Sequence, residues 1–180
     1  MMLNWLDKCD KRLSDFFHHL DNRIATFILH PFALMFNPSF IIVPICVVYA
    51  LSRSKIMTSF YIFCILLSLL MTLITKKALN RNRPQFYGHL KYKTPMFRSK
   101  EKNCSLPSGD SIQATNFALT LFFVAENYNT YFSEQSLTCL LPSMILFVIL
   151  VMLGRVYFMC HYILDTVLGV IMGYGLTVFL

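Results

Sequence analysis

The chain has 180 residues, of which 56% are hydrophobic and only 14% are charged, and its formal net charge is +7. A soluble domain usually carries about 25% charged residues, and a water-soluble core cannot absorb so much apolar sequence. The composition therefore excludes an ordinary soluble domain and indicates an integral membrane protein. Most of the bases lie between apolar runs, where anionic ligands, lipid headgroups and the positive-inside bias account for them. We expect membrane lipids as partners and no nucleic acid.

The first part of the chain is expected to lie on the membrane surface. In residues 1–23, apolar side chains recur at helical spacing with charged residues between them, which is typical of an interfacial helix. His30-Pro31 then interrupts the sequence, because proline removes a helix donor and disfavours helix at the preceding residue. We predict a short interfacial or re-entrant helix up to about Phe36, and an N-terminal amphipathic and interfacial segment over residues 1–36.

Residues 37–180 are predicted to form a transmembrane domain. A first span would run from about Pro38 to Leu51, and residues 57–75 form an uninterrupted apolar run of spanning length. Further apolar runs lie at residues 107–126, 137–153 and 156–180. These runs are too long for strands and lack alternation. The predicted fold class is all-α, a polytopic transmembrane helical bundle of about five to six membrane helices with an N-terminal interfacial helix.

Three short polar segments interrupt the apolar background, and the first runs from Lys76 to Pro84. Lys76 and Arg83 are seven residues apart, so we expect them on one helical face, about 10 Å apart along the axis. Their long side chains can converge on one anion, and Pro84 would stop the helix. The alternative is a cluster of bases that snorkel to lipid headgroups.

The second segment, from Leu106 to Ser111, opens an apolar helix. A helix N-terminus presents free N–H groups and a positive dipole that suit a phosphate. Gly109 permits close backbone approach, and Ser108 adds a hydroxyl donor. The alternative is an ordinary helix cap, because Asp110 followed by Gln113 satisfies a capping pattern without any ligand.

The third segment runs from Gly154 to Asp165 and places Arg155, His161 and Asp165 in an apolar run. Ionisable residues inside a membrane helix are costly and usually mark function. His161 and Asp165 are four residues apart, so we predict them on one helical face. There Asp165 would accept the ring proton and leave the other nitrogen free to attack. The alternative is a buried polar pair that fixes helix packing.

Together the three segments resemble, in order, the signatures of the type 2 phosphatidic acid phosphatase and vanadium haloperoxidase superfamily, in its lipid phosphatase branch. Those signatures are K-x6-R-P, P-S-G-H and S-R-x5-H-x3-D. The matched residues are Lys76, Arg83 and Pro84, then Pro107, Ser108 and Gly109, and finally Arg155, His161 and Asp165. The matched span covers half of the chain.

The resemblance implies a metal-independent lipid phosphate phosphatase and a phosphatase-like domain over residues 37–180. His161 would be the nucleophile that forms a phosphohistidine, and Asp165 would orient it. The phosphoryl oxygens would be held by Lys76, Arg83, Ser108, Gly109 and Arg155. No metal or other cofactor is expected, because the three bases neutralise the charge that a metal would otherwise carry.

Two positions depart from these signatures. Gly154 replaces the usual serine before Arg155, which loses one hydroxyl. Asp110 replaces the histidine that serves the family as the catalytic general acid and protonates the leaving oxygen. Three nearby bases favour the ionised form of Asp110, and a bound phosphate dianion opposes them. We expect Asp110 to be mostly ionised at neutral pH, and therefore a poor acid.

Two functions follow from the aspartate at position 110. In the first, the enzyme acts on a leaving group that needs little protonation. A phosphate leaving from a diphosphate has a pKa of about 6 and meets this condition, whereas an alkoxide does not. A polyprenyl diphosphate is therefore favoured over a lipid phosphate such as phosphatidic acid. In the alternative, the chain is a catalytically impaired relative that serves as a lipid-binding or structural subunit of a membrane complex.

The polar stretch from Lys76 to Leu106 holds nine of the sixteen lysines and arginines. If the residues before Pro38 do not span, the N-terminus and the three polar segments share one side of the membrane. The positive-inside rule makes that side cytoplasmic or matrix. The endoplasmic reticulum is the first expectation for the organelle, and the mitochondrial inner membrane is the second.

Overall fold

The computed structural model describes residues 2–37, 39–86, 90–93, 103–127 and 134–180, and in these ranges the chain is all-α without a strand. The helices are α1 (Met2–His19), α2 (Arg23–Leu34), α3 (Ile42–Ser52), α4 (Lys55–Leu79), α6 (Gly109–Asn127), α7 (Glu134–Tyr157) and α8 (Ile163–Val178). The predicted all-α bundle is confirmed.

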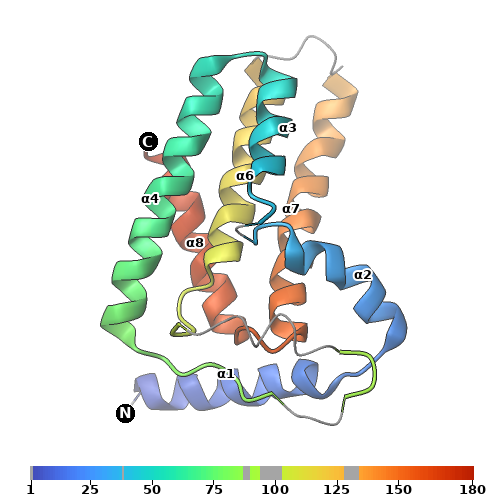
Figure 1. The fold of residues 1–180 in the computed structure, drawn as a ribbon, viewed down its shortest axis with the longest axis vertical. Coiled ribbons are helices and arrows are strands. Elements are labelled where there is room, and N and C mark those ends of the chain that lie inside the picture. Colours follow the sequence, from blue (N-terminus) through green and yellow to red (C-terminus); the bar gives the residue numbers. More distant parts are fainter. Residues whose placement is uncertain (1, 38, 87–89, 94–102, 128–133) are drawn as a thin grey trace.

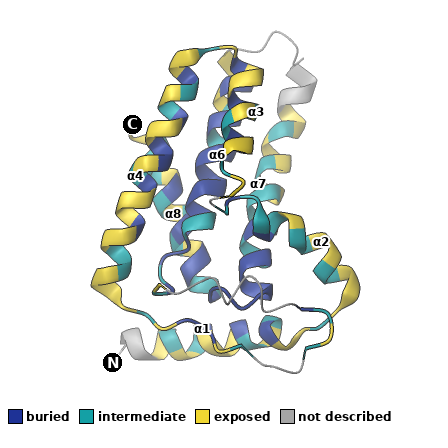
Figure 2. Cartoon of the chain, viewed as in Figure 1, coloured by how far each residue is buried: buried dark blue, intermediate teal, exposed yellow. Residues whose placement is uncertain are grey.

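Helix α6 forms the centre of the bundle. It contacts α3, α4, α7 and α8, which stand beside it in Figure 1. Figure 2 shows α6 buried along most of its length. In the core, the Phe117 ring of α6 lies 6.1 Å from the ring of Phe36 and 6.0 Å from the ring of Tyr61. The other helices are therefore organised around one buried helix, whose first turn belongs to the second polar segment.

Among the described residues, two helices are long and apolar enough to cross a membrane, namely α4 and the part of α7 over Thr138–Tyr157. Helix α4 exposes Phe63 and Leu70 on its outer side, whereas Ser68 and Thr72 are buried against the bundle. An apolar exterior around a polar interior is the arrangement that lipid favours. Helices α3 and α8 are shorter, with 11 and 16 residues.

The N-terminal segment consists of two helices outside the upright bundle. Helix α1 lies across one end of the bundle, and α2 leans against α7 (Figure 1). The predicted break at His30-Pro31 is wrong, because α2 continues through Pro31 to Leu34. Helix α2 packs against α7, where the Phe32 ring lies edge-on to the Phe147 ring with 6.1 Å between the ring centroids. Tertiary packing of this kind favours a helix despite an unfavourable residue within it. The next helix begins at Ile42 and not near Pro38, which lies outside the described residues.

Gly154 of α7 lies at the crossing with α2. A Cβ at this position would lie 3.2 Å from the carbonyl oxygen of Leu29 and 3.4 Å from the Cβ of Ala33. Glycine therefore lets the two helices approach closely. The neighbouring Arg155 donates from Nη1 to the carbonyl oxygen of Ala33 over 3.3 Å, so the same crossing helps to fix the Arg155 side chain.

Helix α4 ends before the predicted stop at Pro84. Asn80 takes the left-handed conformation, with φ of 42°, and its N–H donates to the carbonyl oxygen of Lys76 over 3.0 Å. Asparagine tolerates this conformation better than most residues and so ends the helix. The prediction that Lys76 and Arg83 share one helical face is therefore wrong. Lys76 lies in the last turn of α4, and Arg83 lies in the irregular segment beyond it.

Two glycines let α8 pack directly against α6. A Cβ on Gly169 would lie 2.6 Å from the carbonyl oxygen of Ser108, and one on Gly173 would lie 2.7 Å from that of Ile112. Small residues spaced by four allow such close approach between membrane helices. The first turns of α6 are therefore held against the backbone of α8.

Replacing Gly169 by alanine is expected to destabilise the bundle, because the new methyl group would force α8 away from the α6 backbone. We expect a loss of about 1–3 kcal/mol, measured as a lower midpoint of thermal unfolding in detergent. Gly175→Ala is the matched control, since nothing lies within 4 Å of a Cβ there. Equal midpoints for the two variants would contradict the close packing.

Candidate active site

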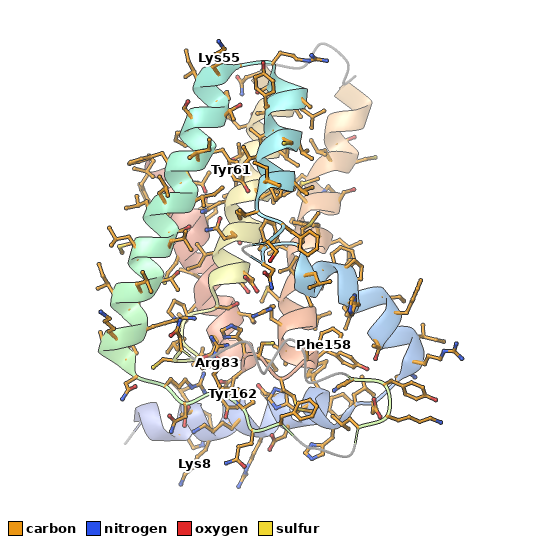
Figure 3. The ribbon with its side chains drawn as sticks, viewed as in Figure 1. Lys8, Lys55, Tyr61, Arg83, Phe158 and Tyr162 are labelled. Atoms are coloured by element: carbon orange, nitrogen blue, oxygen red, sulfur yellow. The ribbon has the colours of Figure 1, made fainter. Side chains whose placement is uncertain are left out.

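One cavity collects residues of all three polar segments. It has a volume of about 600 Å³, and its charged residues come from the ends of the bundle helices that face α1 in Figure 1. Figure 3 labels Arg83 and Tyr162 at this end of the bundle, but neither of them lines the cavity. Its lining includes Thr72, Lys76, Asn103, Gly109, Asp110, Gln113, Arg155 and His161. The remaining lining is apolar and comes mostly from α4. Charged groups and an apolar groove therefore meet in a single space.

His161 lies in the turn between α7 and α8. In this turn Met159 has a positive φ of 56°, and the carbonyl oxygen of Arg155 accepts the N–H groups of Cys160 and His161 over 3.0 and 3.3 Å. The prediction that His161 and Asp165 share one helical face is therefore wrong. Asp165 lies in the first turn of α8, and its carboxylate reaches back toward the turn.

The two ring nitrogens of His161 face opposite charges. Nδ1 lies 3.6 Å from Oδ2 of Asp165, and Nε2 lies 3.2 Å from Nη1 of Arg83. Because a guanidinium can only donate, Nε2 must be the acceptor and Nδ1 must carry the proton. Burial lowers the pKa of His161, Arg83 and Arg155 lower it further, and Asp165 opposes them. The imidazole is therefore neutral at physiological pH, with its lone pair on Nε2.

The carboxylate of Asp165 is fully buried and has a partner on each oxygen. Oδ1 accepts from Nη1 of Arg81 over 2.5 Å. Oδ2 accepts from the backbone N–H of Tyr162 over 2.9 Å and from the hydroxyl of Ser105. Sequence reasoning singled out neither Arg81 nor Ser105. Arg81 lies inside the first polar segment, where its charge was attributed to the general cluster of bases.

The three predicted phosphate-holding bases come from different parts of the fold. Arg83 is held by two carbonyl oxygens, with 2.6 Å from Nε to Asn103 and 2.6 Å from Nη1 to Cys160. Arg155 comes from the last turn of α7, and Lys76 from the last turn of α4. The positive charge of the cavity is thus supplied by side chains. Within the described ranges, no group of three His, Cys, Asp or Glu side chains is placed to hold a metal ion.

The start of α6 reaches the cavity through its backbone. Gly109 lines the cavity, and a Cβ there would lie 3.7 Å from the Thr72 side chain of α4. Ser108 is buried, and its N–H donates to the carbonyl oxygen of Asp165 over 2.9 Å. Its Oγ accepts from the hydroxyl of Ser111 over 3.0 Å, a contact that does not use the Ser108 hydroxyl proton.

Asp110 lines the same cavity as His161 and does not point away from it. Its Oδ2 lies 2.7 Å from Nε of Arg155, and its side chain is 20% exposed. An aspartate at this distance from a guanidinium is held in its ionised form. The negative charge of Asp110 therefore lies beside Arg155, one of the three bases that the sequence predicted to hold the phosphoryl oxygens.

Helix α1 turns a polar stripe toward the site. Asp10, Ser14 and His18 are all buried and are spaced by four residues. Ser14 Oγ accepts from the N–H of Ile163 over 3.0 Å, and Nε2 of His18 lies 3.3 Å from the carbonyl oxygen of His161. The spacing of these residues was visible in the sequence. The apolar residues of the same helix dominated the pattern and indicated only an interfacial helix.

Replacing Asp110 by asparagine is expected to strengthen the binding of inorganic phosphate roughly 10-fold, about 1.4 kcal/mol. The substitution removes a like charge and leaves Arg155 available to the anion. Calorimetry in detergent would measure the dissociation constant. Glu126→Gln is the control, because Glu126 is exposed near the far end of α6. Weaker binding by Asp110→Asn would show that Asp110 helps to organise the anion site.

The chain is similar to a known protein family and to solved structures. The model of the PAP2 superfamily matches residues 58–180. A transmembrane PAP2 type phosphatidylglycerolphosphate phosphatase from Bacillus subtilis is similar over 97% of this chain and 83% of its own, with a TM-score of 0.79 and 18% identity. Aquifex aeolicus LpxE is similar over 93% of this chain and 92% of its own, with a TM-score of 0.67 and 17% identity. No curated protein sequence matches the chain.

Proposed function

This chain belongs to the PAP2 superfamily, and we propose that it is a membrane-embedded lipid phosphate or diphosphate phosphatase that works without a metal. The supporting observation is the single cavity in which His161 and the bases Lys76 and Arg155 meet an apolar groove. A phosphorylated headgroup fits the basic end, and a lipid tail fits the groove. The proposal extends to the domain division, with residues 37–180 as the phosphatase domain.

His161 is the proposed nucleophile. Its Nε2 attacks the phosphorus atom, the bond from phosphorus to the leaving oxygen breaks, and a phosphohistidine forms. The Asp165 carboxylate, 3.6 Å from Nδ1, faces the Nδ1–H group and stabilises the positive charge that the ring gains. Water then attacks the phosphorus atom, the phosphorus–nitrogen bond breaks, and inorganic phosphate leaves. The contact between Nε2 and Nη1 of Arg83 supports this role, because a guanidinium can only donate and Nε2 must then carry the lone pair.

The bases are proposed to stabilise the transferring phosphoryl group. Lys76, Arg83 and Arg155 supply three positive charges, and Ser108 and the N–H of Gly109 supply further donors at the start of α6. Fixed donors around the transferring oxygens stabilise the charge that develops in the transition state. A metal ion would duplicate this role, so the mechanism does not call on one.

The apolar end of the cavity supports a lipid substrate. It is formed by Phe36 and Ile41, by Ile45 of α3, and by side chains of α4 that include Leu66, Leu69 and Leu73. An alkyl chain can pack against such a surface through van der Waals contacts. A soluble phosphate ester would make none of these contacts.

The ion pair of Asp110 with Arg155 supports a diphosphate as the preferred substrate. An ionised aspartate cannot protonate the leaving oxygen. A phosphate leaving from a diphosphate has a pKa of about 6 and departs without that proton, whereas the alkoxide of a monoester does not. A polyprenyl diphosphate is a substrate of this kind.

The same ion pair supports one alternative. With Asp110 in place of the general-acid histidine and with Arg155 already beside a carboxylate, the site can bind lipid phosphate without cleaving it. The chain would then be a lipid-binding or structural subunit of a membrane complex. Phosphate release by the purified protein separates the two functions.

Purified protein is expected to release phosphate from a polyprenyl diphosphate at least 10-fold faster than from phosphatidic acid. His161→Gln should lower the rate of this reaction at least about 1000-fold, because it removes the nucleophile. His19→Gln, an exposed histidine on α1, is the control and should retain activity. Equal rates on both substrates would refute the leaving-group argument. Phosphate binding without release from either substrate would establish the alternative.

Asp110→His is expected to raise the rate on phosphatidic acid about 10- to 100-fold, because a general acid is restored beside the leaving oxygen. The rate on the diphosphate should change much less. Parallel assays of the wild type and the variant on both substrates measure the change. An unaltered preference would show that the leaving group does not limit the reaction.

A further inference from the structure

Arg81 connects the carboxylate behind His161 to helix α1. Its Nη1 donates to Oδ1 of Asp165 over 2.5 Å. Its Nε and Nη2 donate to Oδ1 of Asp7 over 3.1 and 2.6 Å, and Nη2 also donates to Oδ2 of Asp10 over 2.6 Å. The guanidinium lies 4.5 Å from the centroid of the Tyr162 ring, and the side chain is only 10% exposed. Arg81 is therefore fixed on three sides.

The contacts of Asp165 divide between its two oxygens. Arg81 occupies Oδ1, while Oδ2 accepts from the N–H of Tyr162 and the hydroxyl of Ser105 and faces Nδ1 of His161. A carboxylate held at both oxygens cannot rotate about its own axis. The contact with Arg81 thus determines which oxygen is presented to the imidazole.

Helix α1 is itself anchored to the start of α8. Oδ1 of Asp10 accepts from the N–H of Leu164 over 2.9 Å, and Ser14 accepts from the N–H of Ile163. These are the first two residues of α8, whose N–H groups have no partner inside their own helix. Helix α1 therefore caps α8, and the same Asp10 holds Arg81 with its other oxygen. Loss of this helix would remove both contacts.

The cluster around Arg81 contains three carboxylates. In the described part of the chain, Asp7, Asp10 and Asp165 all pair with Arg81, and Asp7 also pairs with Lys11 over 2.6 Å. Burial opposes the charge of Arg81, but the three carboxylates outweigh it and raise its pKa. The His161 ring consequently lies between a negative cluster on its Nδ1 side and arginines on its Nε2 side. Such a field favours the Nδ1–H tautomer of the neutral ring.

We infer that Arg81, held by Asp7 and Asp10 of α1, is a positioning residue that fixes the Asp165 carboxylate for His161. Helix α1 is then a component of the catalytic apparatus as well as an interfacial helix. The family model begins at residue 58, so this contribution comes from outside the matched part of the chain. The inference rests on the proposed function for its effect on turnover, and on geometry alone for its effect on the histidine.

The kinetic test compares Arg81→Gln and Asp10→Asn with the wild type on the preferred substrate. Both should lower kcat about 10- to 100-fold and change KM less than about threefold, because the residues lie behind the nucleophile and not against the phosphate. Arg81→Lys keeps the positive charge but loses the planar guanidinium with its several donors. Its kcat should therefore lie between those of the wild type and Arg81→Gln. Arg12→Gln, an exposed base on α1, is the matched control and should behave as the wild type.

A second measurement is independent of turnover. In protein labelled with ¹⁵N-histidine, the His161 signal is identified by its loss in His161→Gln. The wild type should show the Nδ1–H tautomer, and Arg81→Gln and Asp10→Asn should shift the ring toward a mixture. A wild type without phosphatase activity but with this tautomer shift would reject the proposed function and keep the inference. An unchanged tautomer in both variants, or a raised KM with unchanged kcat, would overturn the inference.

Discussion

A carboxylate buried at the end of a membrane bundle is very costly unless its charge is compensated. Asp165 is fully buried, and the surrounding structure satisfies it with a guanidinium, a hydroxyl and a backbone N–H. Each of these donors comes from a different part of the chain: the segment after α4, the segment before α6 and the turn before α8. The requirement to satisfy one carboxylate therefore ties together the three segments that build the site.

Helix packing makes these contacts possible. Gly169 brings the α8 backbone against the carbonyl oxygen of Ser108, and one turn earlier Asp165 accepts the N–H of Ser108 through its own carbonyl oxygen. The start of α6 and the carboxylate behind His161 are thus parts of one rigid contact. The distance between the proposed nucleophile and the proposed phosphate donors is set by helix packing, which is more rigid than a loop.

The sequence predicted correctly those features that a single physical cause determines, such as a long apolar run or a group of charged residues within an apolar background. Long apolar runs located α4 and α6 within a few residues, and the three polar segments contain every charged residue that lines the cavity. Helix ends were less predictable, because Asn80 and Met159 in left-handed conformations decided where α4 stopped and how the chain turned at His161. Arg81 is separated in the sequence by more than seventy residues from Asp7 and Asp10 of α1 and from Asp165 of α8. No local pattern therefore connected these residues.

Gly154 shows that a departure from a signature can arise from architecture and not from chemistry. The serine that the family signature places here would put its Cβ within 3.2 Å of the Leu29 carbonyl oxygen on α2, tighter than an ordinary contact. Restoring that serine would therefore alter the packing of α2 against α7, and any effect on phosphate binding would come in addition. For a protein engineer, position 154 and helix α2 form one unit, and a signature residue can be transplanted only together with the helix crossing that accommodates it.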